Sequence, residues 1–237
     1  MHDMAADARR AGHGAIEIAG RTFVADVAGA LFCESERLLA VADLHFEKGS
    51  SYAQRRVFLP PYDTAATLAR LTYLAMRYRP RVIVSLGDSF HDRRAGARMH
   101  ASDLAALDSL RRGGDWLWIS GNHDPLVPDR VGGESVADFQ LGPITFRHEP
   151  THGGTSGEIA GHLHPVARVY GRGGSTRRRC FVTDGARCVM PAFGAFTGGL
   201  NIHDAAFAPL FAHGKIVVHA LGRERVHAVG RGRCLPD

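Results

Sequence analysis

The sequence contains little cysteine, and the cysteines that it has are widely spaced. No two of them form a Cys-x-x-Cys pair, and they are too few to staple a chain of 237 residues with disulfides. We therefore expect reduced thiols and a cytoplasmic location, because disulfide frameworks belong to oxidising compartments. The four cysteines are Cys33, Cys180, Cys188 and Cys234.

Long apolar runs are also missing. A membrane-spanning helix needs roughly 20 consecutive apolar residues, and no stretch approaches that length, so we expect no membrane association. Residues 1–14 are polar and charged and lack the apolar core of a signal peptide. We expect them to form a flexible N-terminus that precedes a single domain over residues 15–237.

Lysine is scarce as well. Of the 29 basic residues only Lys48 and Lys215 are lysines, which together with abundant Ala and Gly is typical of a genome-wide preference for arginine. The formal net charge of +5 therefore permits an anionic partner such as nucleic acid without arguing for one.

What the sequence does have is a series of short apolar runs that alternate with helical patterns. The run over residues 82–86 is rich in β-branched residues and stops at Gly87-Asp88, which is typical of a buried parallel strand. Similar runs cover residues 37–42 and 116–120, and helical spacing of apolar residues covers 63–79 and 102–112. This alternation indicates a layered α/β fold.

Beyond residue 125 short strands follow one another without a long helix. This pattern predicts a second, mostly antiparallel sheet that packs against the first, so the expected fold class is α/β with two sheets in one domain. Residues 46–59 and 171–179 are polar and are predicted to be loops.

Polar side chains follow the apolar runs at five predicted strand ends. In an open α/β sheet these ends meet at the edge where ligands bind. Asp88 alone can equally well cap the turn that follows it, but the recurrence of the pattern favours metal binding. The residues concerned are Asp43 and His45, Asp88 and His91, Asn122 and His123, His148, and His162 and His164.

This set of side chains has a definite metal chemistry. Imidazole and carboxylate with one amide oxygen suit Mn, Fe or Zn, and the absence of cysteine argues against a structural zinc site. Seven of these nine side chains as ligands are too many for one ion but suit two ions that share a carboxylate. The chemistry implied is attack of a metal-bound hydroxide on a phosphate ester, with a non-ligand histidine protonating the leaving oxygen.

The motifs resemble, in order, the signature of the calcineurin-like metallophosphoesterases. They are Asp-Leu-His at 43–45, Gly-Asp at 87–88, Gly-Asn-His-Asp at 121–124, a lone histidine at 148 and Gly-His-Leu-His at 161–164. The resemblance implies a four-layered α/β/β/α sandwich of two mixed sheets. It also implies that one metal is held by Asp43, His45 and His164, the other by Asn122, His148 and His162, and that Asp88 bridges them.

The same resemblance suggests roles for three residues that are not metal ligands. His123 matches the proton donor of the family, and Asp124 is expected to shape the loop that carries it. His91, three residues after Asp88, is similar to a histidine that supports the catalytic histidine in the nuclease branch of the superfamily. A surface histidine after a turn remains the alternative for His91.

A further resemblance covers nearly the whole chain. Asp-Leu-His-Phe-Glu-Lys-Gly at 43–49, Gly-Asp-Ser-Phe-His-Asp at 87–92 and Met-Pro-Ala-Phe-Gly-Ala-Phe-Thr-Gly-Gly at 190–199 are similar to the ligase-associated DNA damage response endonucleases, the PdeM type. This family implies two divalent ions, manganese first with zinc or iron as alternatives. It also implies phosphodiesterase activity, single-stranded DNA as substrate, and a functional link to a DNA ligase, a helicase and an exonuclease. The block at 190–199 has no ligand chemistry and predicts a tight turn near the site.

Several basic residues are candidates for substrate contacts. Arg93 and Arg94 follow the strand end that bears Asp88, and Lys48 follows His45, so these three are predicted to bind substrate. Arg172 with residues 177–179 can either track a phosphate backbone or form a solvated loop. Trp116 and Trp118 are predicted to be core residues rather than base-stacking platforms.

Two competing functions stay open on the sequence alone. A small-molecule phosphoesterase of the same fold, acting on cyclic nucleotides or phosphomonoesters, would use the same metal ligands, because specificity lies in the surrounding loops. A protein-binding scaffold without activity is disfavoured, because all seven ligands and His123 are intact.

Overall fold

The first sheet carries part of the predicted site, and the second sheet carries the rest. The computed structural model describes residues 14–60, 62–171, 173–211 and 216–237, so the flexibility expected of residues 1–14 lies almost wholly outside the described residues. Strands of the first sheet run antiparallel from β1 to β4 and parallel from β4 to β7. In spatial order they are β1 (Gly14–Ile18), β2 (Arg21–Ala25), β3 (Leu31–Cys33), β4 (Leu38–Val41), β5 (Val82–Leu86), β6 (Asp115–Ile119) and β7 (Glu134–Val136).

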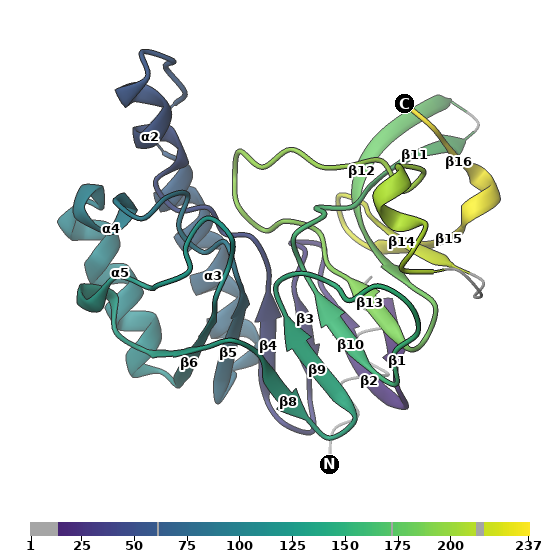
Figure 1. Ribbon diagram of the computed structural model, residues 1–237, viewed down its shortest axis with the longest axis horizontal. Coiled ribbons are helices and arrows are strands. Elements are labelled where there is room, and N and C mark those ends of the chain that lie inside the picture. Colours follow the sequence, from purple (N-terminus) through teal and green to yellow (C-terminus); the bar gives the residue numbers. More distant parts are fainter. Residues whose placement is uncertain (1–13, 61, 172, 212–215) are drawn as a thin grey trace.

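Helices cover the outer face of this sheet (Figure 1). The helix α3 (Asp63–Tyr78) buries Leu68, Leu71 and Leu74 at helical spacing, and α5 (Ala101–Arg112) packs beside it. Both helices contribute to one apolar cluster with the sheet, which also contains Trp116 and Trp118. The indole rings stack 4.6 Å apart and are buried, which confirms that these tryptophans belong to the core.

The second sheet is also mixed. Its path runs β15-β14-β12-β13-β10-β9-β8, and β11 pairs with both β12 and β16. Only the pairs β13–β10 and β10–β9 are parallel. The strands are β8 (Phe139–Leu141), β9 (Ile144–Arg147), β10 (Glu158–Ala160), β11 (Val166–Gly171), β12 (Gly174–Thr183), β13 (Arg187–Val189), β14 (Val217–Leu221), β15 (Val226–Gly230) and β16 (Cys234–Leu235).

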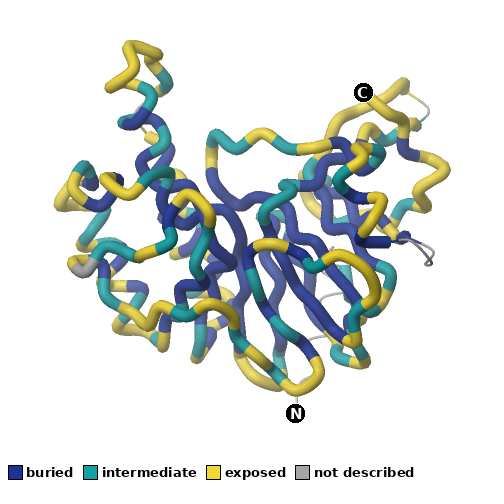
Figure 2. Tube along the Cα trace, in the orientation of Figure 1, coloured by how far each residue is buried: buried dark blue, intermediate teal, exposed yellow. Residues whose placement is uncertain are grey.

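The two sheets face each other across a second apolar cluster that includes Phe23, Phe146 and Phe181. Figure 2 shows the facing strands as a continuous buried layer. A third cluster lies on β11, β12, β13 and β14, and residues around the short 3-10 turn η2 (Ala205–Phe207) pack against it. The remaining 3-10 turns are η1 (Asp129–Val131) and η3 (Arg231–Arg233). The architecture is therefore the predicted α/β sandwich of two mixed sheets, with its long helices on the first sheet.

Two stretches predicted to be loops have regular structure. Residues 46–59 contain the helix α2 (Lys48–Gln54), which is held by neighbours rather than by its own apolar face: Gly49 N donates to Asp63 Oδ2 at 2.9 Å. A second short helix, α4 (Ala95–Arg98), follows β5. Residues 171–179 belong largely to the β11–β12 hairpin, whose second strand begins at Gly174, while Arg172 lies outside the described residues. None of the described helices is long and apolar enough to cross a membrane.

Candidate metal centre

The predicted ligands stand where strands end and the backbone turns sharply. β4, β5, β6, β9 and β10 each end just before one or two of them, as predicted. Left-handed backbone is uncommon for residues other than glycine and costs free energy, and it clusters at functional sites. Five of the predicted ligands have it, with φ of 54° at Asp43, 46° at His45, 45° at Asp88, 69° at His162 and 46° at His164.

Glycine allows the strand ends to approach each other closely. A Cβ atom at Gly121 would lie 2.1 Å from Asp88 N and 2.3 Å from Asp88 Oδ1. A Cβ atom at Gly87, where φ is +72°, would lie 2.5 Å from the His148 ring. The glycines of the Gly-Asp and Gly-Asn-His-Asp motifs therefore permit the contact between strand ends that gathers the polar side chains.

One group of side chains gathers around Asp43, which is fully buried. His164 Nε2 lies 3.2 Å from Asp43 Oδ1, and His162 N donates to the same carboxylate at 3.1 Å. Burial alone would raise the pKa of Asp43, but His164, His148 and His45 together lower it. Burial lowers the pKa of His45 to about 3, so this imidazole is neutral, as a metal ligand must be.

A second group gathers around Asp88 and His148. His148 Nε2 lies 3.5 Å from Asp88 Oδ1, 2.8 Å from Asn122 Oδ1 and 3.1 Å from His162 Nδ1. His148 Nδ1 lies 3.0 Å from Leu86 O and must donate to it, because a carbonyl only accepts. Nε2 of His148 is therefore free of its proton in the neutral ring and available as a ligand.

The donor atoms fit divalent cations. Two sets of three have all their donor atoms within 4.8 Å of one another, namely Asp43, His45 and His164, and Asp43, Asp88 and His148. Within the described part of the chain, His45 Nδ1 is buried without a hydrogen-bond partner, and His164 Nε2 has only the Asp43 carboxylate beside it, at 3.2 Å. Buried polar atoms are normally satisfied, so these nitrogens are accounted for if a cation binds beside them.

His123 stands at the edge of this cluster, with 43% of its side chain exposed. Its Nδ1 lies 3.0 Å from the carbonyl oxygen of His91, so Nδ1 carries a proton and Nε2 faces Asp88 Oδ2 at 4.0 Å. The His91 ring stacks against it, with centroids 5.4 Å apart. His91 thus orients His123 through its carbonyl group and its ring face.

Asp124 lies below the cluster rather than in it. It is 1% exposed, and its Oδ2 accepts a hydrogen bond from Phe90 N at 2.9 Å, which ties the loop after β6 to the loop after β5. Burial raises the pKa of Asp124 to about 7. The loop-shaping role expected of Asp124 stays a prediction.

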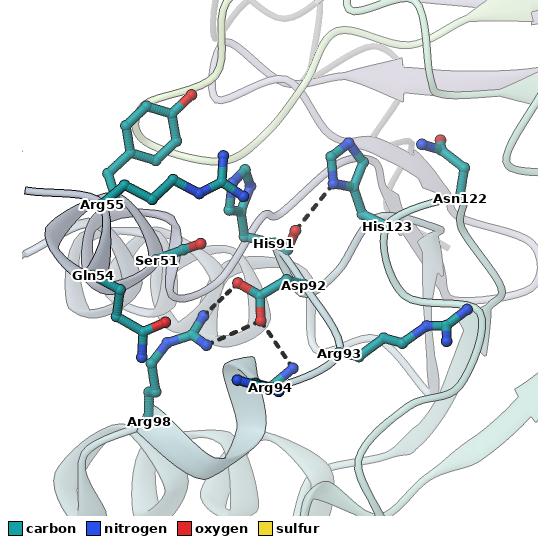
Figure 3. Close-up of a pocket in the computed structure, with 11 residues that line it drawn as sticks. Ser51, Gln54, Arg55, His91, Asp92, Arg93, Arg94, Arg98, Asn122 and His123 are labelled. Atoms are coloured by element: carbon teal, nitrogen blue, oxygen red, sulfur yellow. Dashed lines mark hydrogen bonds and ion pairs between the residues drawn. The ribbon is translucent and has the colours of Figure 1, made fainter. Parts of the chain in front are cut away.

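An open cavity of about 570 Å³ adjoins the cluster (Figure 3). His91, Asn122 and His123 form one wall, and the predicted substrate residues Arg93 and Arg94 line it with exposed side chains. Lys48 does not line this cavity; its ammonium group lies 5.9 Å from the Tyr52 ring centroid.

Sequence reasoning missed the opposite wall of the cavity, which α2 supplies. Ser51 and Tyr52 line the cavity from this helix, and Arg55 lines it from the position just after the helix, where Figure 3 shows it beside His91. Arg98 also lines it, but its guanidinium is paired with Asp92 at 2.7 Å. No apolar periodicity marks α2, so only the density of basic residues at 48–56 pointed to this wall.

The block at 190–199 packs directly behind the first group, as predicted. Phe193 N donates to Ala42 O at 2.8 Å and Gly194 N donates to Asp43 O at 3.1 Å. A Cβ atom at Gly194 would lie 2.3 Å from Leu44 O, so only glycine permits this approach. The block therefore supports the backbone of the Asp43–His45 turn.

Comparison with known proteins agrees with this geometry. The family described as calcineurin-like phosphoesterase matches residues 36–179. The crystal structure of Pseudomonas putida nuclease MPE has a TM-score of 0.70 and 30% sequence identity, covering 92% of this chain and 100% of that chain. Yfce, a phosphoesterase from E. coli, has a TM-score of 0.41 and 14% identity, covering 81% of this chain and 98% of that chain. The search of curated proteins gave no match.

Proposed function

Because the chain belongs to the calcineurin-like phosphoesterase family, we propose that it is a nuclease that uses two divalent ions, manganese first among them, to hydrolyse phosphodiester bonds in single-stranded DNA. Enzymes of this family depend on divalent metals. The observation that carries the proposal is the open, arginine-lined cavity beside the carboxylate and imidazole cluster. The nuclease from Pseudomonas putida, similar over its whole length, supports nucleic acid as the substrate.

The metal ligands are assigned as the sequence predicted. Asp43, His45 and His164 would hold one ion, and Asn122, His148 and His162 the other. Asp88 would be shared, because its carboxylate lies 3.9 Å from His45 and 3.5 Å from His148. Two divalent ions supply Lewis-acid activation of the phosphate and of the attacking water. Among the described residues, the buried Nδ1 of His45 has no hydrogen-bond partner, which supports this assignment.

The chain's own groups then orient the substrate and move a proton. Arg93 and Arg94 bind phosphate oxygens from the floor of the cavity, and Lys48 adds positive charge near His45. His123, with Nδ1 held by the His91 carbonyl group, presents Nε2 and gives its proton to the leaving oxygen when the ring is charged. Asp124 acts at a distance by fixing the loop that carries His123.

The biological setting is part of the proposal and follows the family resemblance. We place the enzyme in DNA repair in the cytoplasm, with residues 15–237 forming one catalytic domain. A functional link to a DNA ligase, a helicase and an exonuclease belongs to the same proposal.

The decisive test is manganese-dependent cleavage of a labelled single-stranded oligonucleotide, run beside a small aryl phosphodiester and a phosphomonoester. His123→Ala and Asp88→Ala should abolish cleavage of both the DNA and the diester. A small-molecule phosphoesterase is the alternative, and the shared ligand set is what keeps it open. Activity confined to the monoester or to small diesters would refute DNA as the substrate and establish that alternative.

A further inference from the structure

The β11–β12 hairpin carries arginine on one face, away from the catalytic cavity. Arg168 of β11 lies directly opposite Arg177 of β12 in the register of the hairpin. Side chains alternate across a strand, so Tyr170 and Arg179, each two residues further along, share this face. The guanidinium groups of Arg168 and Arg177 therefore lie on the same side of the hairpin as an exposed aromatic ring.

A fourth arginine joins this face from α3. Arg179 Nη1 donates to Ala192 O at 2.7 Å, and Arg70 Nη2 donates to the next carbonyl, Phe193 O, at 2.5 Å. Burial, with the charge of Arg179, lowers the pKa of Arg70 to about 10, which agrees with two neighbouring cations. We call the resulting row the arginine stripe, and its members are Arg70, Arg168, Arg177, Arg179 and Tyr170.

The arginine stripe is short of negative charge. Like charges directly opposite each other on two strands repel, and Arg168 and Arg177 are such a pair. Among the described residues, Asp237 alone forms an ion pair with the stripe, 3.4 Å from Arg177 Nη2. Two exposed guanidinium groups, Arg168 and Arg177, backed by the half-buried Arg70 and Arg179, face one carboxylate, and this excess of positive charge favours a polyanion.

The stripe is continuous with the metal cluster. Arg177 Nη2 donates to Gly199 O at 2.8 Å, and a Cβ atom at Gly199 would lie 2.2 Å from His164 O, so the two backbones are in contact. From there the stripe follows the hairpin outwards, and α2 projects on the other side of the molecule (Figure 1). A strand held at the metals would thus leave along the hairpin.

We propose that the arginine stripe binds the sugar-phosphate backbone of single-stranded nucleic acid that extends from the metal cluster, and that Tyr170 stacks on one of its bases. Cationic grooves with exposed aromatic rings are how proteins hold single strands, and Tyr170 is 59% exposed. Tyr170 lies opposite Ser175 in the hairpin, so the stripe extends along β12 from the level of Ser175 to Arg179. This distance is about 13 Å, enough for more than one phosphate group. This inference rests on the proposed function, because only a polymeric substrate reaches the hairpin.

Binding to a labelled single-stranded oligonucleotide in the presence of a chelator tests the stripe, because no cleavage occurs and the metals do not contribute. Fluorescence anisotropy over a range of salt concentrations gives the affinity and its salt dependence. Arg168→Gln should reduce the slope of log K against log salt by about 0.7, the value for one lost phosphate contact on a single strand. Tyr170→Ala should weaken binding at least about fivefold.

Arg178→Gln is the matched control, since Arg178 is exposed on the opposite face of the same strand. If Arg178→Gln reduced the slope of log K against log salt as much as Arg168→Gln does, the attraction would be diffuse, and the proposal of a specific arginine stripe would be overturned. Equal weakening of duplex and single-stranded binding by Tyr170→Ala would overturn stacking. Absence of wild-type binding in chelator would refute the stripe and leave metal-dependent cleavage standing, whereas binding without any cleavage in manganese would refute only the proposed function. Unchanged thermal unfolding would exclude misfolding of these exposed variants.

Discussion

Gly121→Ala offers a sharp test of how the metal centre is assembled. Its new Cβ atom would lie 2.1 Å from Asp88 N, whereas real Cβ contacts are essentially never shorter than 3.0 Å. The loop after β6 or the loop after β5 must therefore retreat by about 1 Å, the difference between these distances. The nearest atom belongs to backbone, so no side-chain rotation relieves the clash.

Two consequences of different size follow. Overpacking of this kind costs about 1–3 kcal/mol in the free energy of unfolding. Metal ligands tolerate displacements of only about 0.2 Å, and a 1 Å misplacement at a reacting centre costs about 100-fold in rate. We therefore expect Gly121→Ala to remain folded, bind manganese weakly and lose about 100-fold in phosphodiesterase activity.

Urea denaturation, calorimetric titration with manganese and hydrolysis of an aryl phosphodiester measure the three quantities. Gly154→Ala is the control, because nothing lies within 4 Å of the Cβ atom that it adds. A compatible Gly→Ala change stabilises by about 0.4–1 kcal/mol, so this variant should match or exceed the wild type. Wild-type manganese affinity in Gly121→Ala would refute the close approach of the two strand ends as the basis of the site.

Three further predictions concern stability. Chelation of divalent metal should lower the free energy of unfolding, because the buried carboxylates of Asp43 and Asp88 then lie in one cluster without a cation. Manganese at 100 times its Kd should restore about 2.7 kcal/mol. A melting temperature that does not change when manganese is added would refute this. Arg187→Met removes from the buried Glu158 its closer arginine, at 2.5 Å, and leaves only Arg147 at 3.6 Å. It should cost about 3–5 kcal/mol in urea denaturation, and a cost below about 1 kcal/mol would contradict this. Phe193→Ala should lower the free energy of unfolding by about 3–5 kcal/mol and weaken manganese binding, since the ring is fully buried behind the site. An unchanged manganese affinity in calorimetric titration would show that the packing of Phe193 does not support the metal site.

The sequence predicted β4 and β5 well because these strands are buried on both sides, whereas the exposed β7 was not predicted. Strands buried on both sides read as unbroken apolar runs, and the glycine and aspartate that end β5 are visible as a break in the run. The side chains at Asp43, Asp88 and His148 were therefore expected to meet, and the structure brings them together. Their roles as metal ligands stay a prediction until metal binding is measured.

The helix α2 and the first part of strand β12, residues 174–179, were missed for a common reason, whereas the second part of β12 was predicted as a strand. Both are held by distant parts of the chain: Gly49 N donates to Asp63, Arg98 Nε donates to Ser50 Oγ, and Arg177 Nη2 donates to Gly199 O. Neither segment has an apolar face that would reveal its period. Local pattern does not encode such tertiary support, so the second wall of the cavity and the arginine stripe emerge only from the fold.

The left-handed backbone at Asp43, His45, Asp88, His162 and His164 has a consequence for laboratory evolution. Each such position costs about 1–3 kcal/mol, and glycine would relieve the strain at once. Selection for thermostability in the absence of metal would therefore favour glycine at these five positions and erase the catalytic centre while improving the fold. An engineer who wishes to stabilise this enzyme must select in the presence of its metal, so that the bound ion outweighs the strain.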